Sequence, residues 1–190
     1  MVIFVEGLND EEFLKDYLDY LSTRFKKTIN FKIIEVGGNK KLKSNKDIKK
    51  YKNDIREVEK VKIIFDADND LEAARENIKE QLGDELFDKC EIFLIPNNKD
   101  RGNLETLIEN IAKEECVLKC FDHYTECLKT LQEKNQNIKL PAKKSKVYAY
   151  NHSFGYKNGY KNGDKNYIID NRYFNLESEY LNSLKEFLLK

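Results

Sequence analysis

The sequence predicts an α/β protein built on a parallel β-sheet. Four short apolar runs alternate with segments of helical period, and roughly 20 to 30 residues separate successive runs, which is the length that a crossover between parallel strands needs. The runs are continuously apolar instead of alternating with polar residues, as expected for strands that are covered on both faces. Together these observations favour a sheet with helices on either side.

The first half of the chain contains the predicted strands, at residues 2–5, 29–36, 61–65 and 90–95. Gly37-Gly38 ends the second strand and Pro96 ends the fourth. Asn9 and Asp10 are suitable caps for the first helix, whose apolar stripe has helical spacing. That stripe consists of Leu14, Tyr17, Leu18 and Leu21. Further helices are expected at residues 47–60 and 71–82.

The second half reads as a mainly α-helical extension. Residues 102–131 form one helix or two, and further helices are expected at residues 143–150 and 177–189. Between them, residues 155–166 read GYKNGYKNGDKN, and their spaced glycines predict a turn-rich loop. We therefore expect an α/β domain at residues 1–110 and a helical extension packed on it at residues 111–190.

Composition limits the function classes. The 190 residues include 34 basic and 34 acidic side chains, so a general basic field for nucleic acid is absent and any such binding must be local. No apolar segment has the length of a membrane span, and the start of the chain lacks the charge order of a secretory signal. Four cysteines without a secretory context suggest reduced thiols, and we expect a cytoplasmic protein.

Carboxylates gather where two predicted strands end. Residues 63–70 read IIFDADND, and Glu6 ends the first strand. Ligand sites in parallel sheets form beyond the carboxyl ends of the strands, and strand residues two apart, such as Asp66 and Asp68, share a face. Clustered carboxylates repel unless a cation neutralises them, and their oxygens suit Mg²⁺ or Mn²⁺. The alternative is a solvated loop at a strand end. A calcium loop is excluded, because Leu71 stands where that loop needs glycine.

The pairing of IFVEGLND with IIFDADND resembles the Toprim domain, which has glutamate-glycine after its first strand and DxD after its third. That domain occurs in primases, topoisomerases, recombination-repair proteins, a ribosomal RNA maturase and the overcoming-lysogenization-defect (OLD) nucleases. Glu6-Gly7 and Asp66-x-Asp68 match its pattern, and the spacing of Glu6 and Asp10 is most similar to the nuclease members. Over residues 1 to about 110, the chain looks like a small stand-alone protein related to the OLD nucleases; GNLE at residues 102–105 adds to this likeness.

The resemblance implies a Toprim, Rossmann-like fold and Mg²⁺- or Mn²⁺-dependent hydrolysis of a DNA or RNA phosphodiester, together with an ATPase partner. It implies that Glu6 is an acid, a base or a second metal ligand, and that Asp66 and Asp68 hold the metal. Asp10 and Asp70 become auxiliary ligands. OLD nucleases use a lysine near the metals, for which Lys146 is our choice. The alternative function is a noncatalytic scaffold of the same fold that binds nucleic acid or a protein.

Three further groups of residues have two interpretations each. Glu105 could add a carboxylate to the metal cluster, whereas Glu109, one turn further along, suits an exposed helix face. The lysine-rich stretch at residues 40–52 could contact a phosphate backbone, but a solvated helix face explains it better. Cys116, Cys120, His123 and Cys127 have helical spacing. Because one helix would spread the outer two over about 16 Å, we expect small buried thiols and no zinc site.

Overall fold

A computed structural model describes residues 1–53, 61–156 and 169–190. Within these residues a four-stranded parallel sheet has the order β2-β1-β3-β4. Its strands are β1 (Val2–Val5), β2 (Lys32–Glu35), β3 (Val61–Asp66) and β4 (Glu91–Ile95). Helices connect successive strands, so the architecture is α/β and Rossmann-like. The predicted fold class, a parallel sheet with flanking helices and a C-terminal helix, is confirmed.

The chain divides into two compact units. The first combines residues 1–107 with residues 177–190, and the second spans residues 108–176. The predicted division placed everything after residue 110 in the extension. The structure instead assigns the C-terminal residues to the α/β unit, because the last helix packs on the sheet.

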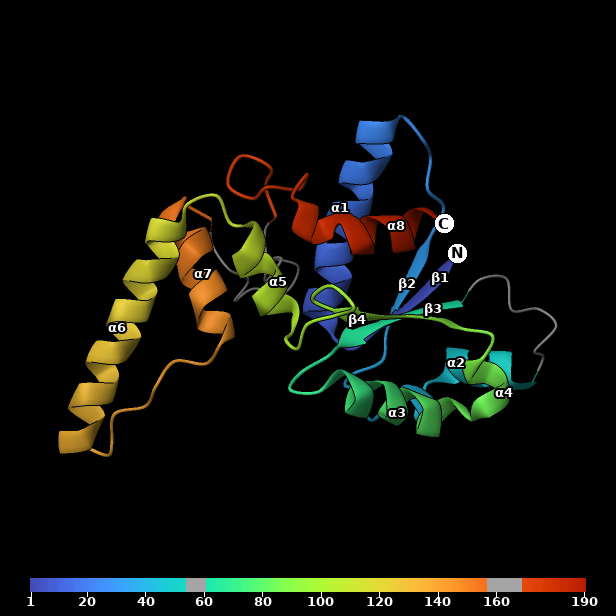
Figure 1. The fold of residues 1–190 in the computed structure, drawn as a ribbon, viewed down its shortest axis with the longest axis horizontal. Coiled ribbons are helices and arrows are strands. Elements are labelled where there is room, and N and C mark those ends of the chain that lie inside the picture. Colours follow the sequence, from blue (N-terminus) through green and yellow to red (C-terminus); the bar gives the residue numbers. More distant parts are fainter. Residues whose placement is uncertain (54–60, 157–168) are drawn as a thin grey trace. The chain divides into compact units, whose positions relative to one another are not determined.

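The sheet of the first unit lies between two layers of helices (Figure 1). One face carries α1 (Leu8–Phe25) and α8 (Asn182–Leu189), and the other carries α2 (Lys46–Asn53), α3 (Leu71–Leu82) and α4 (Asp84–Phe87). The predicted apolar stripe of α1 is buried, and the aromatic rings of Phe93 and Phe187 join β4 to α8 with centroids 5.3 Å apart. Coverage of both faces explains why the strands are continuously apolar.

Parallel pairing brings the carboxyl ends of the strands together. Val5 pairs with Ile64 across β1 and β3, and Asp66 pairs with Ile95 across β3 and β4. The side chains that follow β1 and β3 therefore lie at one edge of the sheet, although about sixty residues separate them in the sequence. This edge carries the candidate site.

A buried lysine links the C-terminal helix to the sheet. Lys62 on β3 is 0% exposed. Its ammonium donates to Glu91 Oε2 at 2.9 Å and to the backbone carbonyl of Phe187 in α8, and it lies 4.3 Å from the centroid of the Phe187 ring. Burial of an ammonium is costly unless its donors are satisfied, so these contacts favour the docked position of α8.

Lys62→Met should lower the free energy of unfolding by about 2 kcal/mol, because the Phe187 carbonyl loses its charged donor and Glu91 loses its partner. Glu91→Gln should cost less than about 1 kcal/mol, since the Glu91 side chain is 41% exposed and can be solvated. Urea unfolding followed by circular dichroism measures both. Equal losses in the two variants would show that the ion pair, and not the contact with α8, carries the effect.

The second unit contains one long helix, a shorter helix that contacts it, and the chain that follows them. It begins within α5 (Leu104–Ile111) and continues through α6 (Glu115–Lys134) and α7 (Lys144–Ser153). Buried Tyr150 donates its hydroxyl to the Tyr173 carbonyl at 2.7 Å, and its ring packs near Phe154 and Phe174. Tyr150 and the aromatic residues around it thus form the centre of the second unit.

The break between α5 and α6 has a tertiary cause. The Asn175 N–H donates to the Ile111 carbonyl at 2.6 Å, and the Lys113 N–H donates to the Tyr173 carbonyl at 2.9 Å. The bridge between Ala112 and Phe174 thus satisfies backbone groups that a continuous helix would pair internally. Residues 102–131, expected as one helix or two, therefore form two.

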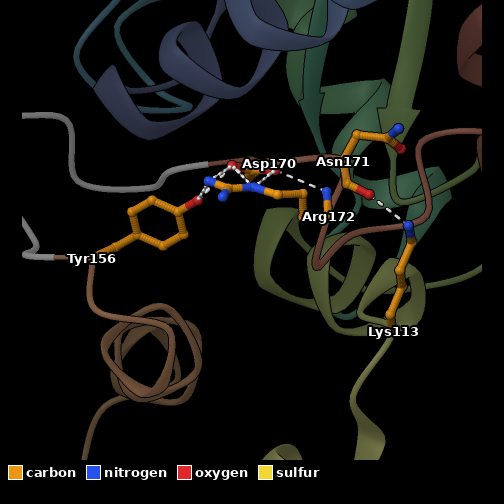
Figure 2. A network of polar contacts seen from close by, with 5 residues as sticks. All are labelled: Lys113, Tyr156, Asp170, Asn171 and Arg172. Carbon is orange, nitrogen blue, oxygen red and sulfur yellow. Dashed lines mark hydrogen bonds and ion pairs between the residues drawn. The ribbon is translucent and has the colours of Figure 1, made fainter.

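A polar network fixes the returning chain (Figure 2). The Arg172 guanidinium donates to both carboxylate oxygens of Asp170, at 3.1 and 2.7 Å, and to the Tyr156 hydroxyl at 2.9 Å. The Tyr156 hydroxyl donates to Asp170 at 2.5 Å, and the Lys113 ammonium donates to the Asn171 carbonyl at 2.5 Å. A bidentate pair of this kind restricts the side chains to one arrangement.

Two sequence expectations fall partly outside the described residues. These are the end of the helix expected at residues 47–60 and most of the GYKN repeats at residues 155–166. The last helix is shorter than expected: a 3₁₀ turn at Glu179–Leu181 precedes α8. None of the helices in the described ranges combines the length and apolar character that crossing a membrane requires.

Candidate functional site

Glu6 and Asp66 meet at the carboxyl ends of β1 and β3. Glu6 directly follows β1, and its Oε1 accepts a hydrogen bond from the Asp66 backbone N–H at 3.2 Å. Asp66 is the last residue of β3, and its Oδ1 accepts from the Leu104 N–H at 3.0 Å, at the start of α5. Backbone donors thus hold both carboxylates in place, and the pairing of β1 with β3 explains their proximity.

Asp10 is positioned by the first turn of α1. The helix begins at Leu8 with Gly7 as its N-cap, so the expectation that Asn9 and Asp10 cap it is wrong. Asp10 stands at the third helical position, and its Oδ2 accepts from the Gly7 N–H at 3.0 Å. It is only 8% exposed. A carboxylate at a helix N-terminus is stabilised by the helix dipole, which favours this position for an acid.

Asp68 reaches the site by a route different from the predicted one. β3 ends at Asp66, so alternation along a strand does not place Asp68 on the face of Asp66. Asp68 has a left-handed backbone (φ 51°) and forms a bridge with Gly102. Gly102 has φ 147°, and an added Cβ would lie 2.9 Å from Thr106 Oγ1, so this position needs glycine. The turn, and not the strand, directs Asp68 to the site.

Asp70 and Glu105 occupy the edges of the site. Asp70 caps α3, because its Oδ1 accepts from the backbone N–H groups of Glu72 and Ala73 at 2.9 and 3.1 Å. This structural role accounts for one of its oxygens. Glu105 lies in the first turn of α5, close enough for its charge to act on both Asp10 and Asp66.

Two hollows open at this edge, and Asp66 lines both. One of about 330 Å³ is lined by Glu6, Asp66, Asp68 and Asp70, together with residues of α3 and of the loop after β2. The other, of about 210 Å³, is lined by Asp10, Asp66 and Glu105. The structure therefore brings six of the seven predicted site residues to one region of the first unit.

The carboxyl groups raise one another's pKa values. Burial, followed by the charge of Asp10, raises the pKa of Glu6 to about 7. Burial also raises the pKa of Asp10 to about 7, with contributions from the charges of Glu105 and Glu35. Burial and the charges of Asp10, Glu6, Glu105 and Asp68 raise the pKa of Asp66 well above its usual range. Such a cluster favours either protonation or a bound cation at neutral pH.

The side chains that could bind a metal ion at this edge are all carboxylates, and carboxylate oxygens are suitable ligands for a hard cation. In the described ranges, however, no three His, Cys, Asp or Glu side chains are arranged to hold a metal ion as they stand. One oxygen each of Glu6, Asp10 and Asp66 accepts from a backbone N–H group, which leaves each carboxylate a second oxygen. These carboxylates thus share one edge of the sheet and line its two hollows.

Lys146 belongs to the second unit. Its ammonium pairs with Glu109 Oε2 at 3.0 Å and with Asp122 Oδ1 at 2.8 Å, and its catalytic role stays a prediction. Glu109, expected on an exposed helix face, is instead a half-buried partner of this lysine, with a side chain that is 30% exposed. Partial burial lowers the Lys146 pKa, but the hydrogen bonds and charges of Asp122 and Glu109 together outweigh it and keep the pKa above its usual value.

Sequence reasoning missed the loop after β2 as part of the site. The backbone N–H groups of Gly37 and Gly38 both donate to the Glu6 carbonyl, at 3.0 and 2.8 Å. Asn39 and Lys40 then line the larger hollow. The glycine pair at the end of β2 was a sequence signal for this loop. Because β2 pairs in parallel with β1, the loop after β2 lies at the same edge of the sheet as Glu6.

The cysteines of α6 are not buried, which corrects the sequence expectation. Cys116, Cys120 and Cys127 are exposed, and Cys90 before β4 is partly buried. The reason is that α6 is mostly solvent-facing, with Leu118 as its buried residue. The helical spacing of the thiols therefore marks the outer face of α6.

Native protein should contain three fast thiols and one slow thiol when treated with Ellman's reagent. Exposure makes Cys116, Cys120 and Cys127 accessible, whereas burial raises the pKa of Cys90 to about 11 and so lowers its thiolate fraction. Absorbance at neutral pH follows the reaction, and denatured protein gives the total. If Cys90→Ser left the slow phase unchanged, the slow thiol would belong to α6 and the assignment would be wrong.

Comparison with known proteins places the chain in a family. No solved structure matches it, and no curated protein does. A family model described as "Protein of unknown function (DUF3226)" matches residues 1–190, which is the whole chain. Since the match covers every strand and helix of both units, the chain belongs to this family, DUF3226.

Proposed function

We propose that the protein is a nuclease that hydrolyses nucleic-acid phosphodiesters with Mg²⁺ or Mn²⁺. One observation carries the proposal: Glu6, Asp10 and Asp66 are held by backbone hydrogen bonds at the carboxyl edge of a parallel sheet, and their pKa values are raised by burial and mutual repulsion. Uncompensated carboxylates of this kind reduce stability, so a functional reason for them is expected.

In this proposal Asp66 and Asp68 hold the ion, with Glu6, Asp10 and Glu105 as further oxygen donors. A bound divalent ion would supply positive charge for the phosphate oxygens and lower the pKa of water. Glu6 would accept a proton from the attacking water. The hydrogen bond from the Asp66 N–H fixes the Glu6 carboxylate for this role.

The similarity of IFVEGLND and IIFDADND to the Toprim domain supports the same proposal. The carboxylates that match that pattern, Glu6, Asp66 and Asp68, line one hollow of the first unit. An ATPase partner, which the likeness to OLD nucleases implies, would supply the nucleic-acid clamp that a chain without net charge lacks.

The test is cleavage of plasmid DNA, single-stranded DNA and RNA by purified protein with Mg²⁺ or Mn²⁺. We expect slow cleavage that chelator abolishes and that Glu6→Gln removes. Glu76→Gln is the matched control, because Glu76 is an exposed glutamate of α3 outside both hollows. Protein that binds nucleic acid equally well with chelator, and cleaves none of the three substrates, would favour the noncatalytic scaffold instead.

A further inference from the structure

A lysine lines the larger hollow beside the carboxylates. Lys40 is exposed and shares this hollow of about 330 Å³ with Glu6, Asp66 and Asp68. Among the described residues that line it, Lys40 is the cationic one. The hollow thus has a strongly acidic wall and a single positive charge.

The backbone directly before Lys40 is fixed by hydrogen bonds to two other elements. On one side, Gly37 and Gly38 donate their N–H groups to the Glu6 carbonyl. On the other, the Asn39 carbonyl accepts from Asn77 Nδ2 at 2.9 Å and from Gln81 Nε2 at 2.6 Å. The loop is therefore tied to β1 and to α3 directly before Lys40. The backbone before Lys40 therefore keeps a fixed position beside the hollow, while the exposed side chain can adjust to a ligand.

Lys40 has no ion-pair partner in the described part of the chain, although carboxylates line the same hollow. Lys32 and Lys50, by contrast, both pair with Asp47. The N-terminus of α3 does not offer its amides either, because Asp70 caps the N–H groups of residues 72 and 73. Lys40 is thus the cationic donor that the hollow presents to a ligand.

We propose that Lys40 binds a phosphate group of the substrate nucleic acid in this hollow, next to Glu6 and Asp66. The proposal rests on the proposed function and adds to it the residue that contacts the substrate. A phosphodiester is repelled by Glu6, Asp66, Asp68 and Asp70 unless cations offset their charge. An ammonium on a fixed loop supplies that charge beside the site and orients the strand toward the carboxylates.

The experiment measures binding instead of cleavage. Short fluorescein-labelled oligo(dT) and oligo(U) strands are titrated with protein in Ca²⁺, and anisotropy is followed at several salt concentrations. Lys40→Ala should weaken binding about tenfold and reduce the salt slope by about 0.7, the value for one phosphate contact on a single strand. Lys40→Arg should retain most of the affinity, since it keeps the charge.

Lys43→Ala is the matched control. Lys43 is an exposed lysine three residues further along, it does not line the hollow, and its backbone contact with Gln81 does not involve the side chain. This variant should bind like the wild type, with an unchanged salt slope.

The outcomes separate the two proposals. If wild-type protein binds the strands and Lys40→Ala binds them with the same affinity and salt slope, the role of Lys40 is wrong and the proposed function stands. If Lys40→Ala and Lys43→Ala weaken binding equally, the basic stretch acts as a diffuse surface and the specific role of Lys40 is also wrong. If wild-type protein binds neither strand, the inference is wrong, whereas the proposed function is decided separately by cleavage of plasmid DNA.

Discussion

Asp66→Asn should reduce nucleic-acid cleavage by about a hundredfold to a thousandfold. Asp66 lines both hollows, and its carboxylate interacts with the charges of Asp10, Glu6, Glu105 and Asp68. The substitution keeps the size of the side chain and an oxygen for the Leu104 N–H, but removes the charge that would bind the ion. Initial rates with Mn²⁺ and with Mg²⁺ measure the loss.

Asp88→Asn serves as the matched control for this variant. Asp88 is exposed, lies after α4 and lines neither hollow, so the same chemical change there should leave the rate unaltered. Cleavage that persists at the wild-type rate in Asp66→Asn would indicate a contaminating nuclease and would remove the main support for catalysis by this protein.

Metal-free protein should lose stability as the pH rises from about 5 to about 8. Folding raises the pKa values of Glu6 and Asp10 to about 7 from ordinary values of 4.5 and 3.8, so the folded state binds more protons than the unfolded state in this range. The resulting stability is present below the unfolded pKa values and is lost as the pH rises through the folded ones. The slope is about 1.4 kcal/mol per pH unit for each extra proton.

Thermal unfolding in the presence of chelator measures this effect. Asp66→Asn should flatten the pH dependence and unfold at a higher temperature than the wild type at pH 8, because the amide removes repulsion from Glu6 and Asp10. Asp88→Asn should follow the wild type. If the wild-type melting temperature did not change over this range, repulsion between the carboxylates would not lower the stability of the folded protein, and the prediction would be wrong.

Local sequence patterns predicted most of the elements. The strand at residues 2–5 and the helix at residues 71–82 have their predicted bounds. A continuous apolar run marks the strand, and the Asp70 cap found in the structure explains where the helix begins. The position of β1 between β2 and β3 was not predictable from such patterns, nor was the break between α5 and α6. That break depends on Tyr173 and Asn175, some sixty residues further along the chain, and no local signal reveals it.

The sequence predicted those residues of the candidate site that lie at the ends of strands. Glu6 and Asp66 end neighbouring parallel strands, so the topology rule places them together. Asp68 was expected near them for a wrong reason, since it is directed by a left-handed turn that the sequence DAD does not disclose. Lys40 was hidden among other lysines. Its place in the hollow and the hydrogen bonds of the loop before it distinguish it from Lys43, which lies outside the hollow.

Calorimetric titration of metal-free protein with Mn²⁺ tests the central claim most directly, that the carboxylates at the ends of β1 and β3 form a cation site. Wild-type protein should bind the ion and release protons near neutral pH, because Glu6 and Asp10 have pKa values of about 7. The measured heat should therefore vary with the ionisation enthalpy of the buffer, and Asp66→Asn should bind far more weakly while Asp88→Asn binds normally. Wild-type protein that takes up no divalent ion at roughly millimolar concentration, where weak carboxylate sites are occupied, would contradict the account.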